Sequence, residues 1–464
     1  MSDSALLSSR TLDRLPAALA QADYDRDAQA CGIVHFGIGA FHRAHQAWYT
    51  DRAMAQGESD WGITGVSLRS AGVARQLNPQ DGLYTLTSCS ADGRTTQLIR
   101  SVRQVLVASD DPDAVIAALA APQTHIVTFT VTEKGYCRAA DGSLDLALAN
   151  DGSIYSFIER GLQVRAERGL PGLTLLSCDN LAHNGRQLER LLHAYVDARN
   201  PALTAWIDRE CRFPSSMVDR IVPATTDGDR DAVQAAIGLE DQGAVVTEPF
   251  SQWVIEDRFA GPRPRWDVVG AELVADVAPY EMAKLRMLNG AHSALAYLGL
   301  QNGHSFVHEA VDDPAIRPLI EALMRQEAAP TIAAAPNQDL DAYATALLAR
   351  FANPALNHRL IQIAMDGSQK IPQRWLETLA DNQRDGKACP AILEALSAWR
   401  CHLRGDNAVM WGAVEDPMRE QLAPLAKGEA ASFAHALFGE SGLFAASWTA
   451  NDAAMRALIE ALGR

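Results

Sequence analysis

The chain has 464 residues, of which 48% are hydrophobic, and a formal net charge of −16. This length predicts two or three domains with sizeable cores, and the acidity argues against nucleic acid and anionic membranes as partners, because both attract basic surfaces. The first thirty residues are too rich in charge for an apolar signal segment, and no later run reaches the roughly 18 apolar residues of a membrane helix. We therefore expect a soluble cytoplasmic protein.

The first credible strand, Ile33 to Phe36, runs directly into G-I-G-A-F at 37–41. Strand, glycine turn and helix is the order that dinucleotide binding requires. Gly37 permits the sharp turn, Gly39 lets the backbone approach a pyrophosphate, and the following helix offers its first N–H groups to the phosphates. His42 stands where the usual fingerprint has a third glycine. Two glycines in a loop are also compatible with a plain turn.

Strand-like and helical runs alternate through the next part of the chain. The expected strands are Gly62 to Leu68, Thr95 to Val107, His125 to Val131, Leu173 to Cys178 and Ala244 to Thr247, with helices such as Asp113 to Ala120 and Asn184 to Val196 between them. This alternation predicts an α/β fold with a Rossmann-like, doubly wound and mainly parallel sheet covered by helices on both faces.

After residue 280 the pattern becomes almost wholly helical. The best candidates are Lys284 to Leu300, Ala315 to Gln326, Leu340 to Phe351, Ile392 to Leu403 and Asp452 to Leu462. We expect a dinucleotide-binding domain over 1–280 and a mostly α-helical substrate and catalytic domain over 281–464.

Polar residues that follow expected strands are candidates for the site. Arg69 stands where NAD-binding proteins usually carry an acidic residue for the adenosine ribose, and an arginine there can instead accept the 2′-phosphate of NADP. Asn180 ends S-C-D-N at 177–180, where a doubly wound sheet places functional loops, although a turn or helix cap is the ordinary interpretation. Asp219 and Arg220 lie between prolines and apolar residues, and simple pairing of their charges is equally compatible with the sequence.

The run K-L-R-M-L-N-G-A-H at 284–292 places an amine, an amide and an imidazole on one expected helix. At about 100° per residue, Asn289 lies roughly 140° around from Lys284 and His292 roughly 80°, so the three can converge. A neutral lysine can take an alcohol proton as hydride leaves carbon, while amide and imidazole groups polarise the oxygen. The alternative is that Lys284 only snorkels and that the other two are ordinary helix residues.

Further along, D-G-S-Q-K-I-P-Q-R at 366–374 offers a turn with two cations, Lys370 and Arg374. These are either solvated charges or the groups that a carboxylated or polyhydroxylated substrate needs.

A metal site is not expected. The seven cysteines are widely spaced without a C-x-x-C pair, which is typical of reduced thiols. His42 and His45 form H-x-x-H, but no nearby cysteine or carboxylate completes a ligand set, so packing or substrate-entrance roles are favoured.

With these residues in hand, the chain resembles the polyol-specific long-chain dehydrogenases, the mannitol dehydrogenase family that includes mannitol 2-dehydrogenase and fructuronate reductase. The resemblance extends from Gly32 to about Phe444. It is carried by G-I-G-A-F-H-R-A-H at 37–45, T-E-K-G-Y at 132–136, S-C-D-N at 177–180, S-M-V-D-R-I-V-P at 216–223, E-P-F-S-Q-W-V-I-E-D at 248–257 and, most specifically, K-x-x-x-x-N-x-x-H at 284–292.

The resemblance implies a role for each matching residue. Lys284 would be the general acid/base, Asn180 and Asn289 would stabilise the reacting oxygen, and His292 would contact a substrate hydroxyl. Further expected contacts are Val218 and Asp219 for the substrate, Glu281 for proton exit to water, and Gly37, Gly39, Ala40, Phe41 and Arg69 for the cofactor.

The resemblance also implies a metal-free cytoplasmic enzyme that uses NAD, with NADP as the alternative, and that is a monomer or small homo-oligomer.

One part of the second domain looks closer to fructuronate reductases than to mannitol dehydrogenases. It consists of N-P-A-L at 353–356, followed by His358, Arg359 and Q-I-A-M-D-G-S-Q-K at 362–370. A uronate needs a cation for its carboxylate, and Arg359, Lys370 and Arg374 are the candidates. We therefore expect interconversion of D-mannonate and D-fructuronate, with mannitol/fructose or arabinitol-type activity as the alternative. A dinucleotide sensor without turnover and a flavin-dependent enzyme are less favoured hypotheses.

Overall fold

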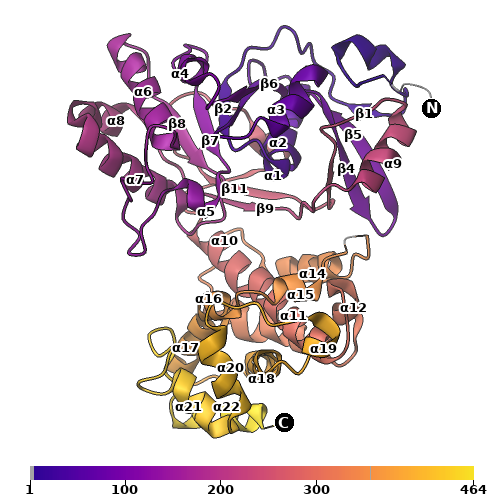
Figure 1. Ribbon diagram of the computed structural model, residues 1–464, viewed down its shortest axis with the longest axis vertical. Helices are drawn as coiled ribbons and strands as arrows, with labels where there is room; N and C mark the ends of the chain where they lie inside the picture. The colour runs from indigo at the N-terminus through magenta and orange to yellow at the C-terminus, as the bar shows by residue number, and fades with distance from the viewer. Residues whose placement is uncertain (1–4, 356, 464) are drawn as a thin grey trace. The chain divides into compact units, whose positions relative to one another are not determined.

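The computed structural model describes residues 5–355 and 357–463 and contains two compact units, Met1–Val277 and Ala278–Arg464. The first unit mixes strands with helices, and the second is helical (Figure 1). The sequence predicts the boundary between domains after residue 280.

The first unit is organised around a five-stranded sheet in which every pairing is parallel. Along the chain, β2, β3 and β6 extend the sheet in one direction, and β7 and β8 then extend it in the other. The order reverses between β2 and β7, which is the topological switch point where doubly wound sheets bind ligands. The predicted Rossmann-like sheet is confirmed. In spatial order the strands are β6 (Val102–Val107), β3 (Ile63–Ser67), β2 (Ile33–Phe36), β7 (Ile126–Phe129) and β8 (Thr174–Ser177).

Successive residues of this sheet enter different cores, as the two-residue period of a strand requires. Val34 and Phe36 of β2 pack with helices α4, α6 and α7, whereas Ile33 packs on the opposite face with helix α2 and strand β11. The sheet is therefore the middle layer of the unit (Figure 1). The helices of this unit are α1 (Ala40–Ala44), α2 (Gln46–Ala55), α3 (Gly72–Leu77), α4 (Pro112–Leu119), α5 (Thr132–Gly135), α6 (Ile154–Glu167), α7 (Asn184–Arg199), α8 (Thr204–Glu210) and α9 (Asp227–Ile237).

Two smaller mixed sheets complete the first unit, and they correct one expectation. The run Thr95 to Val107 is two strands, because the chain turns at Arg100 and Ser101 and the guanidinium of Arg26 binds the carbonyls of Arg100 and Val102 at 2.9 and 2.8 Å. The first of these strands pairs antiparallel with β4, which the sequence did not predict. The small sheets are β1 (Ala20–Gln21), β5 (Gly93–Ile99), β4 (Tyr84–Ser90) and β10 (Val245–Thr247), and β12 (Glu272–Val274), β11 (Gln252–Glu256) and β9 (Ser216–Asp219).

The helix expected after the glycine turn is also different. It breaks at His45, whose φ of −120° and ψ of −89° are not helical, so α1 is only five residues long. The imidazole Nε2 of His45 lies 2.9 Å from the carbonyl of Gln252, and its ring packs on Trp253. This contact with a distant strand fixes the break, and no local signal predicts it.

The second unit packs its helices around α11, in which Gly290, Ala291 and every residue from Ser293 to Leu300 are buried. A helix that is buried on all sides forms the centre of a core. The remaining helices are α10 (Ala278–Ala283), α11 (Gly290–Gln301), α12 (Val307–Asp312), α13 (Arg317–Ala322), α14 (Leu340–Phe351), α15 (Leu360–Ile363), α16 (Gly367–Ile371), α17 (Glu377–Arg384), α18 (Pro390–Arg404), α19 (Ala408–Trp411), α20 (Arg419–Lys427), α21 (Ala430–Phe438) and α22 (Asp452–Leu462).

The helix predicted from Lys284 to Leu300 begins earlier and is not regular. It is preceded by α10, and residues Lys284–Asn289 form a π-helical turn, η5, before α11 begins. Two further π-helical turns, η6 (Leu323–Ala328) and η8 (Pro372–Leu376), lie in the same unit, and the first of them interrupts the helix expected from Ala315 to Gln326. Such turns are rare and occur often at functional sites.

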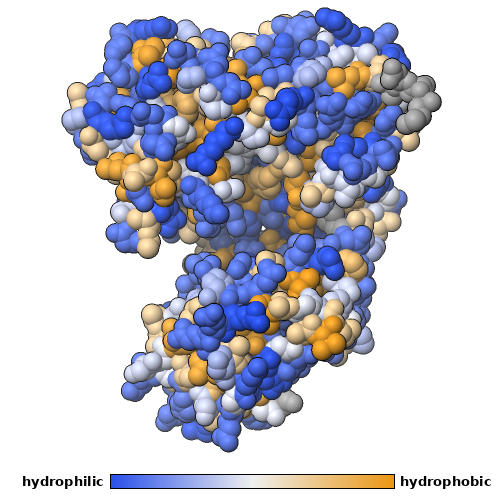
Figure 2. Space-filling model, in the orientation of Figure 1, coloured by the Kyte–Doolittle hydropathy of each residue, from blue (hydrophilic) through white to orange (hydrophobic). Residues whose placement is uncertain are grey.

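The visible surface of each unit is mostly hydrophilic, with small scattered apolar patches (Figure 2). Within residues 5–355 and 357–463, no helix is both long and apolar enough to cross a bilayer. All seven cysteines are free. In the same residues no three His, Cys, Asp or Glu side chains are grouped as a metal site would need.

Candidate functional site

The glycine turn lies at the carboxyl end of β2, at the switch point of the parallel sheet. Gly37 has a φ of +93°, and a Cβ atom at this position would lie 2.1 Å from the carbonyl oxygen of Thr130. Both the backbone angle and the close approach therefore require glycine. Gly39 is exposed, and a Cβ there would have only the oxygen of Gly37, at 3.8 Å, as a neighbour. The backbone that leads into α1 is thus uncovered on this side, as a bound pyrophosphate would need.

The other predicted cofactor residues follow this turn in the chain or lie at the end of the neighbouring strand. Ala40 is the first residue of α1, and the ring of Phe41 stacks on His45 with centroids 5.2 Å apart. Arg69 is exposed and follows β3, the strand next to β2, so its predicted place at the same edge of the sheet is observed.

The carboxyl ends of β7 and β8 are joined by a buried carboxylate that the sequence did not single out. Asp179 accepts hydrogen bonds from the backbone N–H groups of Val131 and Thr132, at 3.0 and 2.8 Å, and from the hydroxyl of Tyr136 at 2.9 Å. Burial raises the pKa of Asp179, and these hydrogen bonds oppose that shift. Asn180, the next residue, is exposed at the bend. The loop that carries Asn180 is therefore fixed to its neighbour before any ligand binds.

Residues Val218 and Asp219 lie on β9, where they pair with Trp253 and Gln252 of β11, and both are buried. The neighbouring Arg220 donates to the carbonyl oxygens of Ala44 and Glu248. Its guanidinium also lies 4.7 Å from the centroid of the Trp48 ring. Arg220 thus serves packing within the first unit.

In the second unit, the π-helical turn η5 carries Lys284 at its first position and Asn289 at its last, and both side chains are half-buried. Hydrogen bonds in a π-helix reach five residues back, so residues five apart lie closer to one face than the roughly 140° that a regular α-helix gives. The angle of about 140° expected for a regular α-helix is therefore wrong for this pair. The wider turn brings the amine and the amide closer to the same side.

His292 lies in the first turn of α11. Its ring centroid is 4.7 Å from that of Phe351 and 5.2 Å from that of His358. Burial, with His358 and the nearby arginines Arg350 and Arg374, lowers the pKa of His292 well below its usual range. Its Nε2 is buried and has no hydrogen-bond partner among the described residues. A neutral imidazole with an unused ring nitrogen suits a contact to a substrate hydroxyl.

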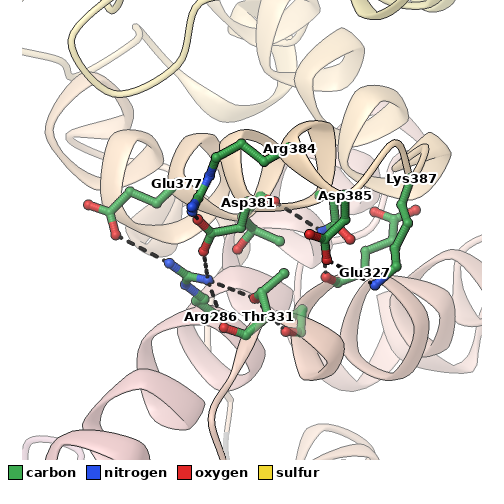
Figure 3. Close-up of polar contacts among 11 residues, drawn as sticks. Arg286, Glu327, Thr331, Glu377, Asp381, Arg384, Asp385 and Lys387 are labelled. Carbon is green, nitrogen blue, oxygen red and sulfur yellow. Dashed lines mark hydrogen bonds and ion pairs between the residues drawn. The ribbon is translucent and has the colours of Figure 1, made fainter.

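Arg286, inside the π-helical turn, anchors it to neighbouring helices (Figure 3). This side chain is 5% exposed, and its guanidinium donates to Asp381 at 2.5 Å and to the hydroxyl of Thr331 at 2.7 Å. Glu377 lies 3.6 Å away. Asp381 also binds Arg384, so the anchor is a small charged network.

The other side of the turn is held by η8. Arg374 donates through Nη1 to the carbonyl oxygen of Asn289 at 3.2 Å and to the hydroxyl of Ser293 at 2.7 Å. The indole N–H of Trp375 donates to the carbonyl oxygen of Gly290 at 3.0 Å. Arg374, predicted for the substrate, thus contacts the end of the turn that carries Asn289.

The remaining predicted substrate cations differ in their surroundings. Lys370 donates to the carbonyl oxygens of Met365 and Ile363 at 2.6 and 3.4 Å, and burial, with a smaller effect of Arg374, lowers its pKa. Arg359 is exposed at a β-bridge to Phe306. Leu356, in the stretch that suggested a uronate substrate, lies outside the described residues.

Sequence reasoning missed Asp179, Tyr136, Arg286 and Trp375. The first three stand in motifs that carried the resemblance, and Trp375 follows the run at 366–374, but the partners of each lie tens of residues away along the chain. Glu281, predicted for proton exit, lies on α10 three residues before Lys284 and is half-buried.

Comparison with protein families matches both units. Residues 31–268 match the mannitol dehydrogenase Rossmann domain, and residues 276–464 match the mannitol dehydrogenase C-terminal domain. D-mannonate oxidoreductase of Escherichia coli K12 is 42% identical over 447 residues, which cover 92% of this chain and 91% of the relative. Mannitol 2-dehydrogenase of Aspergillus terreus is 38% identical over 85% of this chain and 83% of its own length.

Two solved structures resemble this chain over almost its whole length. The ternary complex of Pseudomonas fluorescens mannitol 2-dehydrogenase with NAD and D-mannitol has a TM-score of 0.82 at 35% identity and covers 98% of this chain and 96% of its own. A substrate-free D-sorbitol dehydrogenase has a TM-score of 0.90 at 31% identity with the same coverage. The chain belongs to the mannitol dehydrogenase family and is an oxidoreductase.

Proposed function

We propose that the protein is an NAD-dependent oxidoreductase that interconverts D-mannonate and D-fructuronate without a metal. The observation that carries the chemistry is the π-helical turn with Lys284 at one end and Asn289 at the other, followed by the neutral imidazole of His292, whose buried Nε2 has no hydrogen-bond partner among the described residues. The 42% identity to a D-mannonate oxidoreductase favours the hexonate.

The glycine turn and α1 would hold the cofactor. Gly39 presents uncovered backbone at the switch point, Gly37, Ala40 and Phe41 adjoin it in the same turn, and Arg69 lies at the end of the adjacent strand. NAD, when bound, accepts or supplies the hydride. NADP is the alternative because Arg69 can pair with a 2′-phosphate.

The residues of the chain would move the proton and stabilise charge. In the oxidation direction, neutral Lys284 takes the hydroxyl proton of the substrate carbon. Asn180 and Asn289 donate amide hydrogens to the oxygen as it gains negative charge, and His292 contacts a neighbouring hydroxyl. Val218 and Asp219 are assigned to substrate binding, and Glu281 to passing the proton on to water.

A hexonate differs from a polyol by a carboxylate, which needs a cation. Arg374 uses only Nη1 for its contacts with the described residues, so the other edge of its planar guanidinium can take a bidentate carboxylate. Lys370 and Arg359 are further candidates. Arg374→Lys keeps the charge but loses the fork, and we expect it to weaken hexonate use about tenfold or more.

The test is a parallel assay of purified protein with NADH against D-fructuronate and D-fructose, repeated with NADPH. We expect a higher kcat/KM for fructuronate with NADH. A clear preference for fructose would favour the second candidate, a mannitol 2-dehydrogenase, which the mannitol-bound relative at 35% identity supports. A polyol such as D-arabinitol, assayed with NAD, would extend the comparison to arabinitol-type activity.

A further inference from the structure

A stacked pair of buried imidazoles lies beside the glycine turn. His35 of β2 and His42 of α1 are both 0% exposed, and their rings lie 3.4 Å apart at an angle of 15°. His42 occupies the position of the third glycine of the usual dinucleotide fingerprint, whose role is to let the helix pack closely on the strand. Here two flat rings in contact set the spacing between α1 and β2.

The hydrogen bonds of His35 have a defined direction. Its Nδ1 lies 2.7 Å from the hydroxyl of Thr128, and its Nε2 lies 2.9 Å from the hydroxyl of Thr130. Thr130 donates its single hydrogen to the carbonyl oxygen of Gly37 at 2.7 Å, so it can only accept from His35. The proton of a neutral His35 is therefore on Nε2, and Nδ1 accepts from Thr128. An ordered path leads from the imidazole through Thr130 to the glycine turn.

The surroundings keep both rings neutral. Burial lowers the pKa of His35 to about 3. Burial lowers the pKa of His42 well below its usual range, and the neighbouring His35, Arg43 and His45 act in the same direction. A proton on either ring would place a charge in a dry core, and a second proton on His35 would also reverse its hydrogen bond with Thr128.

We propose that His35 and Thr130 are positioning residues for the cofactor: they hold the Gly37 carbonyl so that the backbone N–H groups at the start of α1 face a bound pyrophosphate. Gly37 also accepts from the N–H of Gly39 at 2.6 Å, so its carbonyl is the point at which the turn is closed. Thr130 directly follows β7, across the switch point from Gly37, and its hydroxyl is the one link from this carbonyl to that segment that the described hydrogen bonds contain. The inference rests on the proposed binding of NAD at this turn.

Two isosteric changes, two residues apart at the end of β7, test it. Thr130→Val removes the link to Gly37, whereas Thr128→Val, the matched control, removes the other hydroxyl partner of the same imidazole and leaves the link intact. Both variants should lose thermal stability, because each leaves one nitrogen of His35 without a partner, and Thr130→Val should lose somewhat more because its hydrogen bond to Gly37 is also removed. Only Thr130→Val should bind NADH more weakly, by about tenfold, the equivalent of one ordinary hydrogen bond.

Thr130→Ser keeps the hydroxyl and should bind NADH within about twofold of wild type. If Thr130→Val does not fold, Thr130→Ala carries the same expectation. NADH affinity is measured by titrating the intact protein, with kcat at saturating NADH as a second readout that should change little. Equal weakening in the valine variants, or none in either, overturns the inference. Failure of the wild-type protein to bind NADH would instead contradict the proposed function.

Discussion

The two turns that carry the proposed site are held by different chemistry. The glycine turn of the first unit is fixed mostly by neutral groups, namely backbone amides, the Thr130 hydroxyl and a neutral imidazole, with one longer contact of 3.4 Å from the Arg43 guanidinium to the Gly39 carbonyl. The π-helical turn of the second unit is fixed by charged groups, with Arg286 on Asp381 and Arg374 on the carbonyl of Asn289. Neutral contacts suit a loop that binds an anion, because they place no negative charge beside it. A charged anchor suits a turn that must resist relaxing to a regular helix. Substitutions in the two turns should therefore have different effects on NADH affinity and on turnover.

The largest effect is expected at Lys284. Lys284→Ala removes the proposed proton acceptor and should lower kcat by about 10²- to 10⁴-fold, the range of general acid–base catalysis. NADH affinity should stay near the wild-type value, because the glycine turn is untouched. Steady-state kinetics and an NADH titration measure the two effects separately. Near-normal turnover would show that the proton-transfer assignment is wrong.

The charged anchor is tested by Asp381→Ala. It leaves the buried guanidinium of Arg286 with only Thr331 and the more distant Glu377, and because Asp381 is itself 26% exposed we expect a loss of about 2 kcal/mol in unfolding free energy. Turnover should also fall, whereas NADH affinity should not. Asp385→Ala is the control, because Asp385 forms an exposed ion pair with Lys387 nearby (Figure 3). This variant should change neither the free energy of unfolding nor turnover. Equal effects of the two variants would show that the contact between Arg286 and Asp381 does not stabilise the π-helical turn.

The buried imidazoles predict a pH dependence of stability. The pKa of His35 is lowered to about 3, and that of His292 lies well below its usual range, so in the folded state both stay neutral where the unfolded chain binds protons. Because the unfolded state then carries more protons, stability is full above about pH 6.5 and falls as the pH drops, by up to about 1.4 kcal/mol per pH unit for each imidazole. Chemical denaturation between pH 7.5 and 5 measures this slope, and His292→Gln should make it shallower. An unchanged slope in that variant would mean that His292 has the same pKa in the native protein as in the unfolded chain, which would contradict the neutral, buried imidazole.

The smallest effect is expected for Trp375→Phe, which removes one hydrogen bond to the carbonyl of Gly290 and keeps most of the packing. We expect a loss of about 1 kcal/mol in the free energy of unfolding and a few-fold lower kcat, with no change in KM for NADH. A change in KM for NADH without a change in kcat would contradict the proposed role of η8 in holding the turn of Asn289.

Local patterns in the sequence predicted the regular elements. The helices Leu340–Phe351 and Asp452–Leu462 have the bounds read from periodicity, because Asp339 and Asn451 cap their first N–H groups as N-cap residues do. The parallel sheet followed from alternation, and Gly37 from turn chemistry. These features are decided by residues close together in the chain.

The elements that the sequence missed depend on distant partners. The break after Ile99 depends on Arg26, and the π-helical turn at Lys284 depends on helices η8 and α17. S-C-D-N indicated Asn180, but only the fold shows that Asp179 is the residue that ties β8 to β7. Helix α6 was not singled out, although its apolar face packs on the sheet.

The central claim is that the amine of Lys284 exchanges the substrate proton. Its most direct test is chemical rescue of Lys284→Ala by small primary amines during oxidation of D-mannonate with NAD. The account predicts that turnover returns in proportion to the concentration of the unprotonated amine. If the variant binds NADH normally but its turnover does not rise with added amine, proton exchange by Lys284 is contradicted.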